Sequence, residues 1–478
     1  MRFPGFVGPG YTLQSLAADC QRCVNWYPEI NELQSAADGE IGSLVQVPGF
    51  LGAYLLGSGP IRGSYATALE QLFFVSGNQL FQVSYTGVIM LRGTLSTFTG
   101  AVSMADNGKQ LLIGDGPNGY LLDLSTNVFT TIVAEGFSGA VTCAYQDGYF
   151  IVNPPGTNTF NISALYDGTS WSGLDFGAAE GSPDLLVACV DNLRQLWLMG
   201  AETIEVWWNS GDSNFPFVRI DGAFIEYGCA APQTAKKFDN SIVWLGGGAR
   251  ANGVVWTCDG FRPRRISNHA VEYAIQQCVD LSTATAYVYQ ANGHSFYVLN
   301  LPDSKTSWVY DSTIQQWHER QALVNGNLQR QLADNHAFCF GKHFVGDYQS
   351  GNVYIMDPTV YTDNGNPLVR IRRSPHLSED MVRVFFSQFI LDATVGVGLD
   401  GSPVVGAAPQ ISLSWSDDYG FTWSPEILMP LGSIGQYRTR VLWNRLGMAR
   451  NRVFQVKVTD PVRVTLLGAE LELQKGTS

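Results

Sequence analysis

Two pairs of adjacent carboxylates, Asp417-Asp418 and Glu379-Asp380, are candidates for acid–base chemistry in this chain. Two carboxyl groups on either side of a glycosidic bond can cleave it, one as general acid and the other as base or nucleophile. Both pairs lie in turn-like sequence, where a solvated loop is the simpler interpretation. A glycosidase stays an alternative, because its two carboxylates can be distant in sequence.

Metal-binding residue types are present, but their spacing argues against a metal site. His336, Cys339 and His343 carry nitrogen and sulfur ligands that suit zinc, yet positions 336 and 339 of a strand face opposite sides. Cys20 and Cys23 are the one close pair among the eight cysteines, and a single C-x-x-C is a weak zinc or redox signal. We therefore expect reduced, buried thiols, no metal and no cofactor.

Motifs of nucleophilic and phosphate chemistry are missing from the sequence. It contains no G-x-S-x-G and no G-x-x-x-x-G-K-[ST]. The run Gly246-Gly247-Gly248 has no lysine or helix signal after it, so it is interpreted as a turn. We expect no catalytic residues and no enzymatic activity.

One segment, SDDYGFTW at 416–423, has the S-x-D-x-G-x-T-W spacing of a turn that sialidase-type propellers repeat on their blades. Ser416 and Asp418 can accept hydrogen bonds from turn N–H groups, Gly420 suits a positive φ, and Trp423 can fold under the loop. The chain has one clear copy. The R-I-P stretch of such enzymes is replaced by FVRID at 217–221. The turn is therefore predicted to be structural.

Short strands separated by tight turns must position these residues. From about 60 to 360, hairpin-like runs such as QLFFVSGNQLFQVSY (71–85) recur at an uneven spacing of about 35–50 residues, and a repeat of roughly 40–50 residues is typical of propeller blades. We count six or seven such units. One helix is expected after Ser267, a plausible N-cap, because Ala270 to Cys278 has helical apolar spacing.

The resulting prediction is an all-β fold in three parts. Residues 1–55 form an extended N-terminal arm, and 56–366 form a β-propeller-like body of short antiparallel hairpins. Longer strands in 367–478 predict an antiparallel β-sandwich-like domain, and one short helix is included. The 51 glycines, 26 phenylalanines and 20 tyrosines, with 15% charged residues, fit a β-rich body.

Composition also limits location. No apolar stretch reaches the length needed to span a bilayer. The opening MRFPGFVGPGYTLQ has proline and glycine where a signal peptide has its apolar segment, so we do not expect secretion.

The net charge of −13 is unevenly distributed. Acidic residues dominate before Pro367, whereas arginine and lysine are in slight excess after it. A chain this acidic is not expected to hold nucleic acid by neutralising phosphates, although DNA could slide past it.

Arginines are grouped in three stretches of the sequence. They form either a solvated face or an interface with another subunit or partner, and the sequence leaves both interpretations open. The candidate interface residues are Arg262, Arg264, Arg265, Arg370, Arg372, Arg373, Arg438, Arg440, Arg450 and Arg452.

Several segments are similar to one known family. The strongest is RVLWNRLGMARNRVFQVKVTDPVRVTLLGAELEL (440–473), and AETIEVW (201–207), VYDSTIQQW (309–317) and VNWYPE…VPGF (24–50) also match. With these segments the chain resembles the tail-nozzle, or packaged-DNA stabilisation, proteins of short-tailed bacteriophages over nearly its whole length.

This resemblance implies a structural protein of the virion tail, assembled in the host cytoplasm. Six copies would form a tube below the portal and its adaptor ring, hold the tail plug or needle, and carry tailspikes or fibres. Packaged DNA would be retained and later pass through the lumen without sequence-specific binding. The alternative is a virion propeller that binds or cleaves glycans, where Trp207 and Trp208 could stack on sugars.

Overall fold

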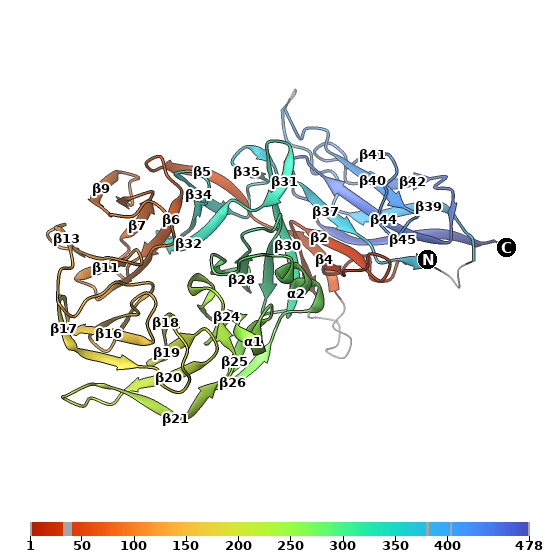
Figure 1. Ribbon diagram of the computed structural model, residues 1–478. Helices are drawn as coiled ribbons and strands as arrows, with labels where there is room; N and C mark the ends of the chain where they lie inside the picture. Colours follow the sequence, from red (N-terminus) through yellow and green to blue (C-terminus); the bar gives the residue numbers. More distant parts are fainter. Residues whose placement is uncertain (1, 32–40, 379–381, 402–403, 477–478) are drawn as a thin grey trace.

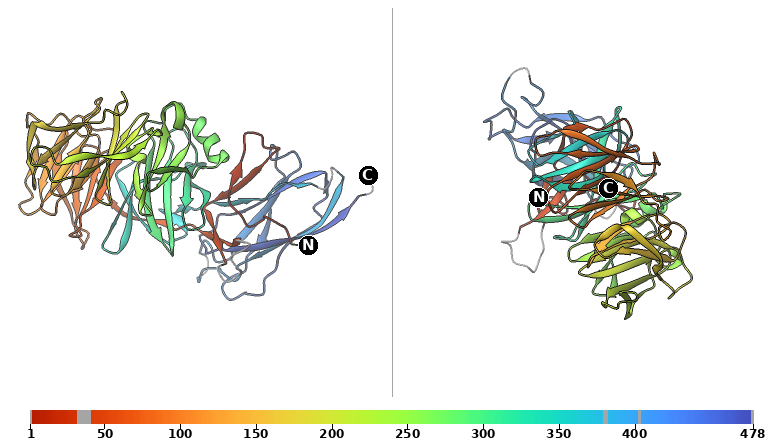
Figure 2. Two further views of the ribbon diagram at one scale, coloured as in Figure 1. Left: turned by 90° about the horizontal axis from the view of Figure 1, so that it is seen from below. Right: turned by 90° about the vertical axis from the view of Figure 1, so that its left-hand side faces the viewer.

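The computed structural model describes residues 2–31, 41–378, 382–401 and 404–476. It is an all-β molecule made of a ring-shaped propeller and a sandwich that lie side by side (Figures 1 and 2). The first and last described residues, Arg2 and Gly476, both lie in the sandwich (Figure 2). No helix within these ranges is long and apolar enough to cross a membrane.

The first five blades of the propeller follow one another along the chain, each an antiparallel sheet. Blade 1 consists of β6 (Ile61–Ala66), β7 (Leu72–Ser76), β8 (Gln79–Val83) and β9 (Ile89–Thr94). Blade 2 consists of β10 (Ser103–Asp106), β11 (Gln110–Gly114), β12 (Gly119–Asp123) and β13 (Phe129–Thr131). Blade 3 consists of β14 (Cys143–Gln146), β15 (Tyr149–Val152), β16 (Thr159–Ala164) and β17 (Asp167–Ala178). Blade 4 consists of β18 (Leu186–Asn192), β19 (Gln195–Gly200), β20 (Ile204–Asn209) and β21 (Phe217–Ile225). Blade 5 is β22 (Gly228–Cys229), β23 (Lys236–Phe238), β24 (Ser241–Gly247), β25 (Val255–Asp259), β26 (Arg262–Arg265).

The last two blades are built differently, because both take part in contacts with the N-terminal segment. Blade 6 is β27 (Thr285–Ala291), β28 (His294–Asn300), β29 (Ser307–Asp311), β30 (Gln316–Val324), extended by β31 (Asn327–Arg330). Blade 7 is β32 (Ala333–Cys339), β33 (Lys342–Asp347), β34 (Asn352–Asp357), and its fourth strand is β5 (Gly49–Leu55) from the start of the chain. Short β35 (Thr362–Asp363) and β36 (Asn366–Pro367) continue this sheet.

Seven blades therefore form the ring within the described residues, at the upper end of the six or seven expected. The inner strands β6, β10, β14, β18, β23, β27 and β32 contact one another in turn, and β32 returns to β6. Middle strands such as β7, with the sequence LFFVS, are buried on both faces because neighbouring blades cover them. Gly77, with φ +54°, makes the tight turn between β7 and β8.

The sandwich packs two sheets over one apolar core. The first contains β3 (Trp26–Ile30), β4 (Ile41–Gln46), β45 (Leu466–Lys475), β39 (Val384–Ala393), β42 (Val441–Asn444) and β43 (Met448–Ala449). The second contains β1 (Tyr11–Thr12), β2 (Cys20–Val24), β37 (Arg370–Arg373), β38 (Leu377–Ser378), β44 (Asn451–Val458), β40 (Gln410–Ser416) and β41 (Ile427–Pro430). Between them, the ring of Phe389 packs on Phe6, Trp443 and Phe454 with centroids 5.0–5.8 Å apart.

A single 12-stranded sheet joins the two bodies. Strand β2 pairs in parallel with β30 of blade 6 and antiparallel with β37 of the sandwich, so hydrogen bonding is continuous from one body to the other. At this junction Asn25, with φ +57°, donates from its amide to the carbonyl oxygens of Gln321 (2.8 Å) and Val369 (2.7 Å). Arg22 pairs with the Glu319 carboxylate, Nε to Oε2 at 3.0 Å. The two bodies are thus coupled by backbone, amide and charge contacts.

The division at residues 55 and 366 stays a prediction. The strands of the segment expected as an arm pair with both bodies: β1 to β4 belong to sandwich sheets, and β5 belongs to blade 7.

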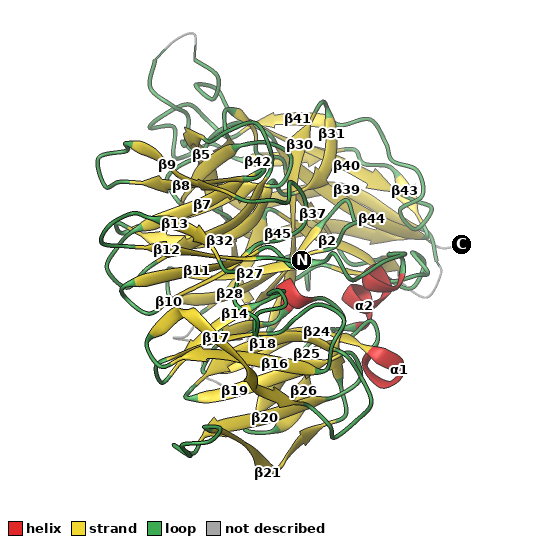
Figure 3. Ribbon diagram, turned by 60° about the vertical axis from the view of Figure 1, so that its left-hand side comes forward, coloured by secondary structure: helices red, strands yellow, loops and turns green. Residues whose placement is uncertain are grey.

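Helices are few, as Figure 3 shows in red. The expected helix is α2 (His269–Gln276), but its N-cap is Asn268, whose side chain accepts from the N–H of Val271 at 3.0 Å. Ser267 instead accepts from the N–H of Val255, so its hydroxyl ties the loop to blade 5. The structure adds a one-turn helix, α1 (Gly248–Ala251), where a turn was expected, and the 3-10 turn η1 (Pro232–Thr234).

Candidate functional site

The turn at 416–423 is closed by hydrogen bonds between its own residues. Gly420 N–H donates to Ser416 Oγ at 2.7 Å, and the N–H and hydroxyl of Thr422 donate to the Asp418 carboxylate at 2.8 and 2.6 Å. The hydrogen bonds from Thr422 are the main reason that the pKa of Asp418 is lowered to about 2. Gly420 has φ +96°, and Trp423 Nε1 donates to its carbonyl oxygen at 3.1 Å. The polar groups of the turn therefore face one another.

The neighbouring carboxylate, Asp417, is bound to an arginine of the same chain. Arg452 donates from Nε to Asp417 Oδ1 at 2.6 Å and from Nη2 to Oδ2 at 2.7 Å. The second expected pair, Glu379-Asp380, lies outside the described residues. Asp417 is consequently engaged in a two-point ion pair, which ties the turn to β44.

Arg370 and Arg372 on β37 are completely buried within the single chain. Arg372 donates to the carbonyl oxygens of Phe6 (2.6 Å), Gly5 (2.8 Å) and Pro9 (2.8 Å) at the N-terminus. Arg370 donates to Val462 O at 2.6 Å. Burial lowers the pKa of both guanidinium groups to about 10.

These contacts correct the expectation for three arginines. Arg370, Arg372 and Arg452 are each at most 1% exposed, so neither a solvated face nor a subunit interface describes them. They are internal anchors, because most of their donors bind oxygen atoms of the same chain, although the buried Nε of Arg370 has no hydrogen-bond partner among the described residues. A run of arginines on a β-strand could not reveal this, since alternate side chains of one strand enter different environments.

Arg373 differs from its neighbours on β37. Its guanidinium lies 4.5 Å from the ring centroid of Trp423, and it donates to Gln455 Oε1 at 3.0 Å. The tryptophan of the turn is therefore covered by a cation, and the two predicted sets of site residues meet at this point.

The remaining candidate arginines lie at the surface. Arg262, Arg264 and Arg265 are exposed on β26, the outer strand of blade 5, and Arg265 pairs with Glu272 of α2 at 2.6 Å. The other exposed members are Arg438, Arg440 and Arg450 in the sandwich. For these six residues the interface and the solvated-face interpretations both stay open.

The histidines expected not to bind metal do meet, across β32 and β33. His336 Nε2 lies 2.9 Å from His343 Nδ1, and burial together with His343 lowers the pKa of His336 to about 3. Cys339 is buried, which raises the pKa of its thiol. Within the described ranges, no three histidine, cysteine or carboxylate side chains are arranged to hold a metal ion.

Of the two tryptophans considered for sugar stacking, one is packed inside the propeller. The Trp207 ring lies 5.3 Å from that of Phe160, and its Nε1 donates to Glu205 at 2.9 Å. Trp208, on the opposite face of β20, is 47% exposed.

A cavity at the propeller axis is the feature that the sequence did not reveal. It has a volume of about 760 Å³, and a second cavity of about 320 Å³ shares Gln233, Lys236, Ser103 and other residues with it. Inner strands of several blades line both, so the residues that meet there come from distant parts of the chain. No short motif could have identified it.

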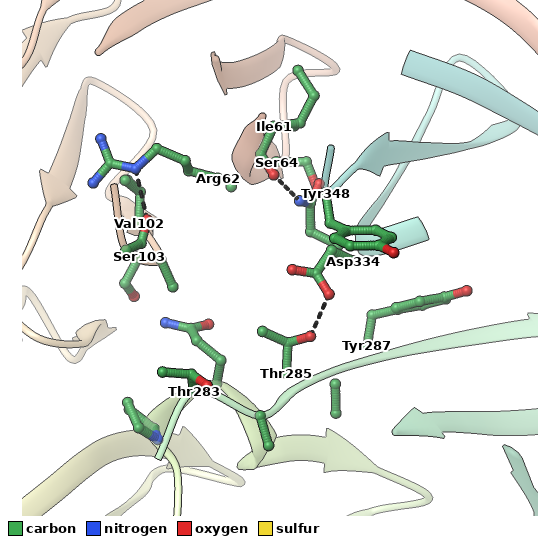
Figure 4. Close-up of a pocket in the computed structure, with 18 of the residues that line it drawn as sticks. Ile61, Arg62, Ser64, Val102, Ser103, Thr283, Thr285, Tyr287, Asp334 and Tyr348 are labelled. Carbon is green, nitrogen blue, oxygen red and sulfur yellow. Dashed lines mark hydrogen bonds between the residues drawn. The ribbon is translucent and has the colours of Figure 1, made fainter. Parts of the chain in front are cut away.

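Figure 4 shows Asp334 projecting from blade 7 toward the space of the larger cavity. Thr285 donates to Asp334 Oδ1 at 2.5 Å, and Arg330 donates to the same oxygen at 2.9 Å. Arg62, at the left of Figure 4, donates mainly to carbonyl oxygens, among them Gly100 at 2.6 Å and Thr97 at 2.7 Å.

The comparisons with known proteins give one family. A family model described as "Bacteriophage P22 Gp10, beta-propeller" matches residues 21–361, and one described as "Bacteriophage P22 Gp10, beta-sandwich" matches residues 370–474. No curated protein matches the chain.

Solved structures similar to the chain share little sequence identity with it. The WD40 beta propeller domain of Doa1 is 14% identical, with 64% of this chain and 96% of that chain covered and a TM-score of 0.41. The extracellular domain of BT4673 from B. thetaiotaomicron is 9% identical, with 65% and 39% covered and a TM-score of 0.45. The computationally designed Ika8 protein is 13% identical, with 65% and 99% covered and a TM-score of 0.38.

Proposed function

Since this chain belongs to the bacteriophage P22 Gp10 family, the tail-associated DNA-stabilising proteins of short-tailed phages, we propose that six copies of it form the tail nozzle. The chain is a structural protein of the phage tail with a β-propeller and a β-sandwich. In the proposal, the hexameric tube sits below the portal and its adaptor ring, holds the plug or needle, and carries tailspikes or fibres.

The observation that carries the proposal is the continuous sheet through β30, β2 and β37. A wall segment of a pressurised tube must transmit force between its two bodies without opening a hinge. Here the bodies share backbone hydrogen bonds, the Arg22–Glu319 ion pair and the buried Asn25 amide. A flexible linker between domains would instead allow relative motion.

The charge supports a lumen through which DNA passes. A net charge of −13 opposes tight binding of the phosphate backbone, which is the requirement for retaining DNA under a plug and then releasing it quickly. Assembly in the host cytoplasm and absence of enzymatic activity are part of the same proposal.

The exposed arginines are proposed to contribute to contacts between copies. A ring needs heterologous interfaces, in which one face of a subunit meets a different face of the next. The exposed Arg438 and Arg440 could pair with acidic surface of the propeller of a neighbouring copy.

Glycan cleavage is the second candidate, and the contacts of the turn weigh against it. Asp417 is paired with Arg452, and Asp418 is hydrogen-bonded to Ser416 and Thr422, so neither carboxylate of the motif is available as acid or base.

The direct test is the size and shape of the purified full-length chain, by light scattering and negative-stain imaging, alone and with a portal–adaptor complex. Six-fold rings that bind this complex support the proposal. A chain that stays monomeric with the portal–adaptor complex present, or that releases sugar from host-surface glycan, contradicts it.

A matched pair of variants tests the arginine contacts separately. Arg438→Glu with Arg440→Glu should weaken ring formation and leave the melting temperature of the monomer unchanged, because both side chains are exposed. Arg194→Glu serves as the control, since this residue is 83% exposed on blade 4, away from the sandwich. Rings insensitive to the double reversal and to high salt would leave these arginines as solvated surface.

A further inference from the structure

Lys236 is the cation at the propeller axis whose charge is least compensated. It lies at the start of β23 and lines both axial cavities. Its ammonium makes one hydrogen bond, a long one of 3.4 Å to Gln233 Oε1, and no carboxylate of the described residues lies within ion-pair distance. An ammonium has three donors, so two of them have no partner among the described residues.

Neighbouring cations are satisfied by the protein itself. Lys237 pairs with Asp191 at 2.6 Å, and Arg330 pairs with Asp334 at 2.9 Å. Arg62 donates to four carbonyl oxygens, those of Gly77, Thr97, Thr99 and Gly100. Lys236 therefore differs from every cation close to it.

The lining of the larger cavity is positive, although the chain as a whole is acidic. Its charged side chains are Arg62, Lys236 and Asp334, because burial keeps His336 neutral with a pKa of about 3. Burial also lowers the pKa of Lys236 to about 8, which is the cost of keeping an ammonium from water, and the charge of Asp334 offsets only part of that cost. An anion placed here would offset that cost.

The larger cavity also contains side chains that can bind the hydroxyl groups of a ligand. Asp334 uses Oδ1 for Thr285 and Arg330, whereas its Oδ2 accepts no hydrogen bond from the described residues. Thr283 and Ser103 add hydroxyl groups to the lining, and both are labelled in Figure 4. A cavity of about 760 Å³ lies within the size range of small-molecule sites.

The geometry points to the larger axial cavity as a binding site for a small hydroxyl-bearing anion, with Lys236 as its counter-charge and Asp334 as a hydroxyl acceptor. Acidic sugars and sugar phosphates share this chemistry. The site lies inside one propeller, so it is independent of how copies assemble.

The experiment is titration calorimetry of the full-length chain with four probes of similar size: glucuronate, glucose 6-phosphate, glucose and glucosamine. The two anionic probes should bind, and neutral glucose should bind at least about tenfold more weakly, because it lacks the charge-assisted bond to Lys236. Glucuronate tighter than the phosphate would identify a carboxylate site, and the reverse order a phosphate site.

Matched variants locate the binding. Lys236→Met keeps the length of the side chain and should weaken binding of the better anion about tenfold or more, whereas Lys237→Met should leave it unchanged. Lys236→Arg retains the charge and should retain binding if Lys236→Met fails to fold. Equal affinity for glucose and glucuronate, undiminished binding by Lys236→Met, or no binding of either anion at tens of millimolar would each overturn the proposal.

Discussion

Arg452 and Asp417 form a two-point ion pair in which one partner is buried and the other is half exposed: their side chains are 2% and 44% accessible. The guanidinium also lies 4.5 Å from the ring of Phe386 and donates to Leu446 O at 2.5 Å. The pair connects the turn at 416–423 to the start of β44. Because Arg452 is buried and Asp417 is half exposed, removing Arg452 and removing Asp417 should change the stability of the domain by different amounts.

Asp417→Asn is expected to destabilise the sandwich more than Arg452→Met. The first change leaves a buried cation without its carboxylate, at a cost of about 1–3 kcal/mol, whereas the second removes the buried charge and leaves Asp417 in water. Urea unfolding followed by tryptophan fluorescence measures both. Asp392→Asn, at an exposed position, is the control, and the reverse order of stability would contradict this assignment.

Trp423→Ala is expected to lower the free energy of unfolding by roughly 1–2 kcal/mol, because Trp423 covers the turn and receives the Arg373 cation. Phe421→Ala, two residues earlier and 68% exposed, should change it by less than about 0.5 kcal/mol. Thermal unfolding compares the two variants. Equal effects would mean that Trp423 does not lock the hairpin.

Arg372→Lys is expected to release the N-terminal segment. The planar guanidinium donates to the carbonyl oxygens of Gly5, Phe6 and Pro9 at the same time, and the ammonium of a lysine cannot make all three hydrogen bonds. Limited proteolysis should then cut between residues 5 and 22 several times faster. Arg463→Lys, at an exposed position on the same domain, should leave the cleavage rate unchanged.

Two buried histidines are expected to make stability depend on pH in opposite directions on either side of pH 6.5. Hydrogen bonding to Asp311 raises the pKa of His294 to about 9, so its contribution is complete below 6.5 and is lost as the pH rises through 9. Burial lowers the pKa of His318 well below its usual value, so its contribution is present above 6.5 and is lost as the pH falls below it.

His294→Gln isolates the alkaline side of this profile. It should flatten the decline in stability between pH 6.5 and 9, by up to about 3 kcal/mol, although His376, whose pKa is also raised to about 9, should preserve part of the slope. Unfolding free energies measured at intervals across this range provide the test. A wild-type profile that rises from pH 6.5 to 9 would contradict the assignment.

The blades could be predicted from sequence because each one is local. A hairpin such as β7–β8 joins residues a few positions apart, and its apolar runs and its Gly77 turn lie within one short segment. The same locality made the α2 helix visible, with an error of one residue at its N-cap.

What could not be predicted depends on contacts between distant positions. The pairing of β2 with β30 and β37 joins residues hundreds of positions apart, and the burial of Arg372 follows from that pairing. Lys236 and Asp334 likewise meet only after the ring closes. The sequence therefore placed Arg262 and Arg372 in the same group of candidate interface residues, although Arg262 is exposed and Arg372 is buried.

The completion of blade 7 by β5 determines when during synthesis this blade can form. The closing strand is synthesised first, yet its partner β34 ends at Asp357, so residues 49–55 must wait for about 300 further residues before they can pair. The sandwich waits longer still, because β3 and β4 need β45 near the other end. Chains that end before β34 therefore lack the partner of the closing strand, and chains that end before β45 lack a strand that the sandwich sheet needs.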